Sequence, residues 1–398
     1  MKIGVFSNLY PPMERGGAEL VAQRVADEFS RHGHEVFVLS TMPFAGLDSL
    51  RFHATERHIE RVYRFFSLNL YHLTNASRMP FPLRLVWQAV DAMGPLPHAH
   101  IAQLLKKEDP DVVFTHNLKG LGLHAARLIQ QAGIRHIHTL HDVQLSVPSG
   151  LLIHGKENHW MNRGWPRKVY ERVAKHALGR PDVVISPSHF LADFYRGRGF
   201  FQNDQMHILP NPAPRATSAS QRFSVMIPGP VRFLYVGQLE PHKGLLNMLE
   251  SLSRLSFPFE LHIAGDGSLA SFISGRAQRD AFVFYHGFIS LEHIRKLMIH
   301  ADAVLVPSVC YENSPTVIYE AFQLGVPVIA SRIGGIPELI EDGQDGLLVQ
   351  PGSVLELVSA MEKIAVNRSD FWSRSSAIKK AAERFSLKRY VDQLEEFL

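Results

Sequence analysis

The 398-residue chain has little of what marks secreted, membrane-spanning or nucleic-acid-binding proteins. Its single cysteine, Cys310, excludes a disulfide framework within the chain and is typical of a reducing compartment. No run approaches the ~18–20 consecutive apolar residues of a membrane span, and the first residues lack the apolar core of a signal peptide. With 42 basic and 38 acidic residues, the net charge of +4 is too small for a typical nucleic-acid-binding surface. We therefore expect a cytoplasmic protein, soluble or peripheral to the inner face of the membrane.

The chain does contain a regular alternation of short apolar runs and helical patterns, which is typical of parallel α/β layers. The runs predict strands at 2–9, 35–40, 112–115, 134–140, 183–187 and 206–209, and again at 232–236, 261–264, 303–306, 326–330 and 347–349. Because the chain is too long for one compact core, we expect two Rossmann-like domains, 1–212 and 231–380. A Pro-, Ala- and Ser-rich linker at 213–230 would join them, and 381–398 would form a C-terminal helix.

Open parallel sheets bind ligands at the carboxyl ends of their strands, so the loops after the strands are where a site is expected. In the second half these loops are rich in glycine, which lets the backbone approach a ligand closely. The residues of interest there are Gly237, Gln238, Lys243, Gly265, Asp266 and Gly287. We expect the two sheets to face each other across a cleft that these loops line.

A helix start after the strand at 303–306 is the most informative of these segments. Ser314 is suited to capping the helix and Pro315 to its first position. Free backbone amides and the helix dipole make such an end a site for anions. Glu312 precedes the cap and Glu320 lies inside the helix, so the two carboxylates could bracket a ligand. By itself the pattern fits equally well a capped helix whose glutamates face solvent.

In the first half, polar residues also follow the strands. Gly16 and Gly17 come after the first strand and open a helix, His116 follows the strand at 112–115, and His141 and Asp142 follow the strand at 134–140. We expect them at the ligand-binding edge of the first sheet, where His141 could donate a hydrogen bond or accept a proton.

A metal site is an alternative for the histidines of the strand at 134–140. His136 and His138 share one face of that strand and, with His141 and Asp142, could hold an ion. No second group of ligands has a recognisable spacing. Polar strand residues are therefore the preferred interpretation of His136 and His138.

The order of the second-half motifs resembles retaining glycosyltransferase family 4. The motifs are Gly237-x-Leu239 with Lys243-Gly244, then Gly265-Asp266-Gly267, Glu312-x7-Glu320, Gly325-x-Pro327 and Gly334-Gly335-x-Pro337-Glu338. The resemblance covers essentially the whole second half and reaches the first through Gly16-Gly17-Ala18-Glu19 and residues 138–142. It implies a GT-B fold, a polysaccharide-synthesis type of hexosyltransferase, and a UDP- or GDP-linked sugar as donor.

The resemblance also implies roles for the matching residues. Lys243 would contact the donor diphosphate, Glu312 the transferred sugar and Glu320 the ribose. The remaining donor contacts would come from Asn313, Ser314, Pro315, Thr316, Gly265, Asp266, Gly287 and the loop of Gly16 and Gly17. His141 matches a histidine that lies close to the transferred sugar. From their positions after the strands, His116, His141 and Asp142 are the candidates for binding the acceptor. Many family members have arginine at the position of Gln238, so Lys243 and the helix start would neutralise more of the phosphate charge here.

We expect transfer without a metal ion or cofactor. The Asp-x-Asp motif, Asp109-Pro110-Asp111, lies at a helix-to-strand turn, on the opposite end of the sheet from the expected cleft. The acceptor would be a glycan, a lipid-linked sugar or a small molecule. The alternatives are a catalytically degenerate nucleotide-sugar-binding module, a GT-B isomerase, and a phosphorylase, which would need a lysine that holds pyridoxal phosphate.

Two stretches combine basic and aromatic residues, at 61–90 and 164–180. In the second, Trp165, Val169 and Val173 form one helical stripe, which we expect to face the core while the basic residues face solvent. A contact with a membrane surface is the alternative. By the resemblance, the last helix at 381–398 would cross back to the first domain.

Overall fold

The computed structural model describes residues 1–13, 16–57, 60–93, 98–159, 162–201, 205–215, 226 and 228–398. The chain divides into two compact units. Unit 1 comprises Met1–Leu151, Asn158–Asn211 and Leu387–Leu398, and unit 2 comprises Leu152–Glu157 and Pro212–Ser386. Most of the predicted linker, at 216–225 and 227, lies outside the described residues.

Unit 1 is built on an eight-stranded sheet of order β3–β4–β2–β1–β5–β6–β7–β8. Its strands are β1 (Lys2–Phe6), β2 (Glu35–Thr41), β3 (His53–Arg57), β4 (Glu60–Phe65), β5 (Val112–Thr115), β6 (Arg135–Thr139), β7 (Val183–Ser186) and β8 (Met206–Ile208). Its helices are α1 (Gly17–Arg31), α2 (Phe81–Met93), α3 (His98–Glu108), α4 (His124–Gln131), α5 (Gly164–Leu178), α6 (His189–Arg196) and α14 (Leu387–Glu395). All neighbouring strands are parallel except β3 and β4.

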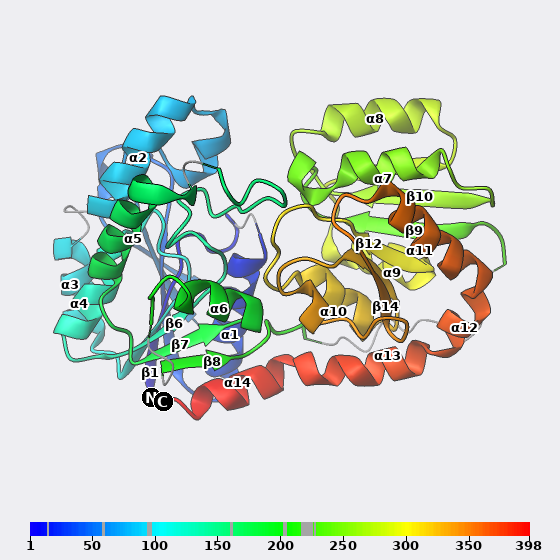
Figure 1. Cartoon of the computed structure of the whole chain (residues 1–398). Coiled ribbons are helices and arrows are strands. Elements are labelled where there is room, and N and C mark those ends of the chain that lie inside the picture. The colour runs from blue at the N-terminus through cyan, green and yellow to red at the C-terminus, as the bar shows by residue number, and fades with distance from the viewer. Residues whose placement is uncertain are drawn as a thin grey trace. The chain divides into compact units, whose positions relative to one another are not determined.

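The helix α14 belongs to unit 1 although it lies at the far end of the sequence (Figure 1). Its buried Val391 and Leu394 join one hydrophobic cluster with Val25 and Phe29 of α1 and Val5 of β1. The four-residue spacing of the apolar side chains on α1 produces this buried stripe. Burial of apolar surface therefore holds the two ends of the chain together within one unit.

Unit 2 is built on a six-stranded, all-parallel sheet of order β11–β10–β9–β12–β13–β14. Its strands are β9 (Val231–Val236), β10 (Phe259–Ala264), β11 (Val283–Gly287), β12 (Ala303–Val306), β13 (Val328–Ser331) and β14 (Gly346–Val349). Its helices are α7 (Leu245–Leu252), α8 (Ala270–Arg279), α9 (Leu291–His300), α10 (Thr316–Gln323), α11 (Val354–Val366), α12 (Arg368–Ser373) and α13 (Ser375–Ala382). Hydrophobic clusters cover both faces of the sheet. The predicted fold class, two α/β domains on parallel sheets, is confirmed.

Two strands of unit 1 have no counterpart in the sequence prediction. β3 and β4 form the antiparallel edge of the sheet, and β4 includes the first residues of the basic and aromatic stretch at 61–90. Val62 and Phe65 of β4 are buried, but Arg61 and Arg64 interrupt the apolar pattern. An edge strand with long charged side chains gives only a weak signal of alternation.

The predicted orientation of α5 is wrong. Trp165 is 76% exposed, and Val169 and Val173 are each 39% exposed. The buried side of the helix instead carries Ala174 and Glu171, whose carboxylate accepts a hydrogen bond from Ser146. Small residues allow close packing, and a hydrogen-bonded glutamate can be buried at low cost, so the larger apolar stripe is left outside.

Among the described residues, none of the helices combines the length and the apolar character that crossing a membrane requires.

Candidate functional site

The carboxyl edge of the unit 2 sheet is formed by closely packed glycine loops. Gly244 precedes α7 with φ of 77°, and a Cβ atom there would overlap the carbonyl oxygen of Pro307, just after β12. Gly265, after β10, has φ of 145°, and a Cβ there would overlap the carbonyl oxygen of Gly237, after β9. Only glycine permits these approaches. The loops after three neighbouring strands are thereby drawn together at one edge.

Lys243 and Glu312 form an ion pair at this edge, although 69 positions separate them. The Nζ of Lys243 donates to the Oε1 of Glu312 at 2.6 Å, and the Ser308 hydroxyl donates to the same oxygen at 2.8 Å. The side chains are only 23% and 16% exposed. Burial opposes the charge on Glu312, but the Lys243 cation and both hydrogen bonds hold the pKa of Glu312 below its ordinary value.

Burial likewise opposes the charge on Lys243, but the Glu312 carboxylate outweighs it and raises the pKa of Lys243. Both groups are therefore charged at neutral pH, and a fixed cation lies at the edge of the sheet.

Helix α10 begins one residue later than predicted. Pro315 occupies the capping position with ψ of 119°, and no side chain caps the helix. Ser314 is buried and forms a hydrogen bond with the Tyr319 hydroxyl, so the predicted serine cap is wrong. A proline at this position has no side chain that could accept from the first-turn amides. The start of α10 thus keeps the character of an anion site, four residues after Glu312.

Gly334 and Gly335 contact the backbone of Glu312. The amide of Gly335 donates to the backbone carbonyl of Glu312 at 2.7 Å. Gly334 has φ of 61°, and a Cβ there would overlap that same carbonyl oxygen. The sequence predicts Gly334-Gly335 as a glycine turn after the strand at 326–330, ahead of a helix opened by Pro337, but not a contact with Glu312. In the structure the pair fixes the backbone that carries the Glu312 carboxylate.

The other predicted donor residues lie around this edge. Gln238 is exposed, and its carbonyl accepts a hydrogen bond from Tyr235 at 2.7 Å. Asp266 is exposed and accepts from the amide of Gly267 at 2.8 Å. Gly287 ends β11 with φ of 66°. The residues of the α10 region are Asn313, which is buried, Thr316, which opens the helix, and Glu320, which is half-buried within it.

In unit 1 the structure pairs two of the predicted residues directly. The Nδ1 of His116 and the Nε2 of His141 are 2.8 Å apart, and the rings are stacked. Burial, followed by the neighbouring His138, lowers the pKa of His141 to about 3, and burial also lowers the pKa of His116 well below its ordinary value. Both imidazoles are thus neutral at pH 7, which favours hydrogen bonding over proton acceptance by His141.

His136 and His138 behave as polar strand residues. The Nε2 of His136 and the Nδ1 of His138 each lie 2.8 Å from the hydroxyl oxygen of Thr115 on the neighbouring strand β5. Both histidines are buried. One ring nitrogen of each histidine thus forms a hydrogen bond within the sheet, as the preferred interpretation proposed.

Asp142 is part of a half-buried polar group that sequence reasoning missed in part. Its carboxylate accepts from the amide of Gln144 at 2.8 Å and from its side-chain amide at 2.9 Å. Burial raises the pKa of Asp142 to about 6 and that of Asp91, on α2, to about 7. Lys119 interacts electrostatically with both carboxylates. Asp91 and Lys119 had no motif to reveal them, since their only signal is burial in the folded unit.

Gly16 and Gly17 open α1 after β1. Gly16 is the capping residue, and its amide donates to the carboxylate of Glu19 at 2.8 Å, while Gly17 is the first helical residue. Gly16 and Gly17 follow β1, His116 follows β5, and His141 and Asp142 follow β6, so all five lie at the carboxyl edge of adjacent strands.

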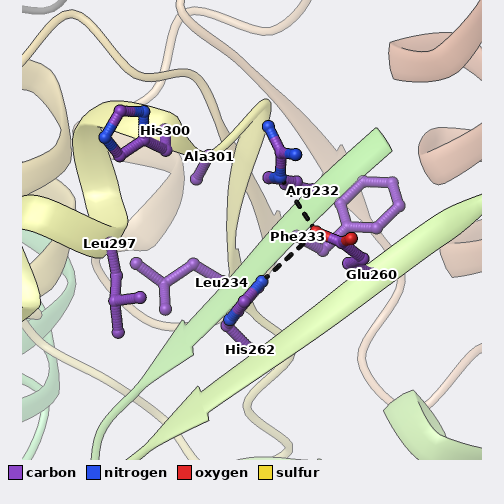
Figure 2. A pocket seen from close by; sticks show the side chains of 8 residues that line it. All are labelled: Arg232, Phe233, Leu234, Glu260, His262, Leu297, His300 and Ala301. Atoms are coloured by element: carbon purple, nitrogen blue, oxygen red, sulfur yellow. Dashed lines mark hydrogen bonds and ion pairs between the residues drawn. The ribbon is translucent and has the colours of Figure 1, made fainter. Parts of the chain in front are cut away.

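Unit 2 also contains a separate pocket of about 340 Å³. Figure 2 shows the side chains that line it. Its polar side chains are Arg232, Glu260, His262 and His300, and the Glu260 carboxylate lies 2.9 Å from Arg232 and 3.6 Å from His262. Arg232 and Glu260 stand near the beginnings of β9 and β10, at the edge opposite Lys243. The pocket is therefore distinct from the candidate site.

Comparisons with known proteins agree with this architecture. Residues 15–215 match the family model for Glycosyltransferase Family 4, and residues 230–367 match that for Glycosyl transferases group 1. Glycogen synthase of Mycobacterium tuberculosis is 28% identical over 385 residues, which cover 92% of this chain and 86% of the relative.

Solved structures share the fold. Sucrose-phosphate synthase from Thermosynechococcus elongatus has a TM-score of 0.74 at 18% identity and covers 99% of this chain and 97% of its own. Anabaena Alr3699/HepE in complex with UDP-glucose has a TM-score of 0.68 at 20% identity, with coverage of 100% and 98%.

Proposed function

This chain belongs to glycosyltransferase family 4 and has a GT-B fold, and on that premise we propose that it is a retaining, metal-independent transferase for a nucleotide diphosphate sugar. The observation that carries the proposal is the pairing of Lys243 with Glu312 beside the start of α10. When the bond between the sugar and the nucleotide breaks, negative charge develops on the diphosphate. A cation and a helix amino terminus held in place are groups that stabilise such charge.

In the proposed complex Lys243 turns partly from Glu312 to the diphosphate, while the first-turn amides of α10 face the same phosphates. Glu312 remains held by Ser308 and Gly335, so its carboxylate can accept hydrogen bonds from sugar hydroxyls. Glu320, further along α10, would accept a hydrogen bond from the ribose. The exposed side chain of Gln238 adds no charge there, which leaves neutralisation to Lys243 and α10.

Metal independence is proposed because the site has its own source of positive charge. The Asp-x-Asp motif does not contribute to the candidate site, because it lies in the turn between α3 and β5. Asp109 has φ of 44° in this turn. Asp111 accepts a hydrogen bond from the amide of Lys2 at 2.7 Å. These are the features of a structural turn at the amino-terminal edge of the unit 1 sheet.

For the acceptor we propose a sugar hydroxyl of a glycan or of a lipid-linked sugar, held at the edge of unit 1 that carries His141 and Asp142. The neutral imidazole of His141 would form a hydrogen bond with the transferring sugar rather than serve as a strong base. UDP-glucose is the first donor to test, because the structural neighbour HepE binds it.

Contact of unit 1 with an anionic membrane surface is also part of the proposal. The exposed stripe of Trp165, Val169 and Val173 on α5 supports it, since Lys168 and Arg172 are exposed beside the stripe. Aromatic and aliphatic side chains flanked by cations are typical of interfacial helices. The Trp165→Ala variant should float less than the wild type with phosphatidylglycerol vesicles. With phosphatidylcholine vesicles, both proteins should float equally little. Equal flotation of both proteins with anionic vesicles would exclude this surface.

A donor panel tests the proposed function. The chain should release nucleoside diphosphate from one nucleotide sugar, faster with an acceptor present, with the anomeric configuration retained in NMR spectra of the product and an initial rate unaffected by EDTA. A degenerate binding module would bind a donor and release nothing. An isomerase would convert the donor with no acceptor present, and a phosphorylase would show the absorbance of bound pyridoxal phosphate.

A further inference from the structure

Four potential metal ligands lie together on unit 1, away from the candidate site. His32 and His34 occupy the turn between α1 and β2, and Asp392 and Glu395 lie one turn apart on α14. This turn lies at the amino-terminal edge of the sheet, whereas His116 and His141 lie at the carboxyl edge. Figure 1 shows α14 beside α1 within this unit.

The two histidines converge on one carboxylate. The Nδ1 of His32 lies 2.8 Å, and the Nε2 of His34 lies 3.1 Å, from the same Oε1 of Glu395. A ring nitrogen of His32 and carboxylate oxygens of Asp392 and Glu395 lie within 4.8 Å of one another. Ligand atoms around a tetrahedral zinc ion, bound at about 2.0–2.2 Å, are roughly 3.4 Å apart. Small rotations of His32, Asp392 and Glu395 would reach that spacing. His34 lies outside this group of three and would join it through the side of Glu395 that it already contacts.

The surroundings suit an ion as well. The side chains of His34 and His32 are 16% and 23% exposed, so the ligands are partly desolvated yet open to entry. The buried carboxylate of Glu28 lies 3.8 Å from the other ring nitrogen of His32. A histidine bound to a metal commonly directs its second nitrogen toward such a carboxylate.

Lys388, which pairs with Asp392 in this structure, would compete only weakly with a metal ion for this carboxylate. Lys388 lies 2.8 Å from Asp392, one helical turn away, and the two side chains are 75% and 45% exposed. Exposed pairs of this kind contribute little to stability, so Asp392 can turn to an ion at low cost.

We propose that His32, His34, Asp392 and Glu395 bind one divalent transition-metal ion, with Zn²⁺ the best match. Two imidazoles with two carboxylates favour Zn²⁺ over Mg²⁺ or Ca²⁺, which prefer oxygen ligands alone. The ion would link the turn at 32–34 to α14, more than 350 positions away in sequence. Its role is structural: it adds a coordinate link to the apolar packing of Val391 and Leu394 against α1. This site is independent of the proposed transfer reaction.

The test uses the full-length chain, stripped with a chelator and returned to metal-free buffer. Calorimetry with ZnCl₂ should show one saturable equivalent, and the unfolding midpoint should rise by about 5 °C or more at ~100-fold excess over Kd. Co²⁺ should give the visible absorption bands of a four-coordinate ion. A wild-type protein with no saturable equivalent of Zn²⁺ overturns the proposal.

Two variants and a matched control locate the ion. Glu395→Gln keeps the size of the side chain and removes its charge, and His34→Ala removes one imidazole. Each should weaken Zn²⁺ binding at least tenfold and, at the same Zn²⁺ concentration, reduce the rise in midpoint by about half or more. His53→Ala removes a histidine of another histidine–carboxylate pair, 3.4 Å from Asp48, and should bind as wild type. Unchanged Zn²⁺ affinity in either Glu395→Gln or His34→Ala contradicts the assignment.

Discussion

Replacement of Lys243 by methionine tests both the stability and the chemistry of the candidate site. Met preserves the length of the side chain but leaves the Glu312 carboxylate, 16% exposed, without its cation. Removal of one partner from a buried pair costs about 3–5 kcal/mol. Since Ser308 still donates to Glu312, we expect the lower end, about 3 kcal/mol in the free energy of unfolding of unit 2. In turnover, loss of one charge-stabilising donor corresponds to a decrease in kcat of about 10²–10³-fold.

The destabilisation should depend on a second substitution and on pH. Lys243→Met/Glu312→Gln carries no uncompensated charge and should recover at least half of the lost stability. The wild-type pKa of Glu312 is lowered, so its contribution to stability is present above the ordinary glutamate pKa and is lost as pH falls through the lowered value. In Lys243→Met burial raises that pKa instead. The deficit of the variant relative to wild type should therefore shrink between pH 7 and pH 4.5.

Urea unfolding of the wild type, both variants and Lys296→Met at the two pH values measures these effects, and initial rates with a donor measure kcat. Lys296 pairs with Glu292 on the exposed surface of α9, so its substitution should change neither quantity. The reasoning is refuted if the single and double variants agree within about 0.3 kcal/mol, since that is the level of simple additivity. An unchanged kcat in Lys243→Met would remove Lys243 from the chemistry.

Three further outcomes follow from the same contacts. Gly244→Ala should lower the free energy of unfolding by about 2–4 kcal/mol, because a Cβ would overlap Pro307. The control, Gly343→Ala, has φ of 84° and open space around it, and should cost about 1 kcal/mol. Equal urea midpoints for the two variants would contradict this. Asp142→Asn should stabilise unit 1 by about 1–2 kcal/mol at pH 7.5 and by almost nothing near pH 4, because the wild-type pKa is raised from its ordinary value to about 6. The cost of the buried charge therefore grows as pH rises between these two pKa values and is complete only above about pH 6; a gain that persists at pH 4 would exclude this cause. His141→Gln should lower kcat about 10-fold or more with little change in donor KM. Because the pKa of His141 is lowered to about 3, the pH–rate profiles of the wild type and the variant should have the same shape near neutral pH.

The interior strands of both units were predictable because their signals are local. β5 and β12 begin and end at the predicted residues, and β9 differs by one residue. The loops with Lys243 and Glu312 were also located from sequence, since glycine and proline mark the ends of strands and helices wherever they fold. The orientation of α5 was not predictable, because Trp165 and Glu171 lie on two helical stripes and the periodicity alone does not say which stripe is buried.

The sequence by itself determined two α/β halves, the ordered motifs of a glycosyltransferase family and the chain positions of its candidate residues. Only the tertiary structure decided that Lys243 reaches Glu312, that His116 stacks on His141, that Gly334 and Gly335 support the Glu312 backbone, and that α14 rests on α1. The reason is physical. Periodicity and turn residues act over a few positions, whereas these contacts depend on the order of strands in the sheet, in which β9 lies beside β12 rather than only beside its neighbour in sequence.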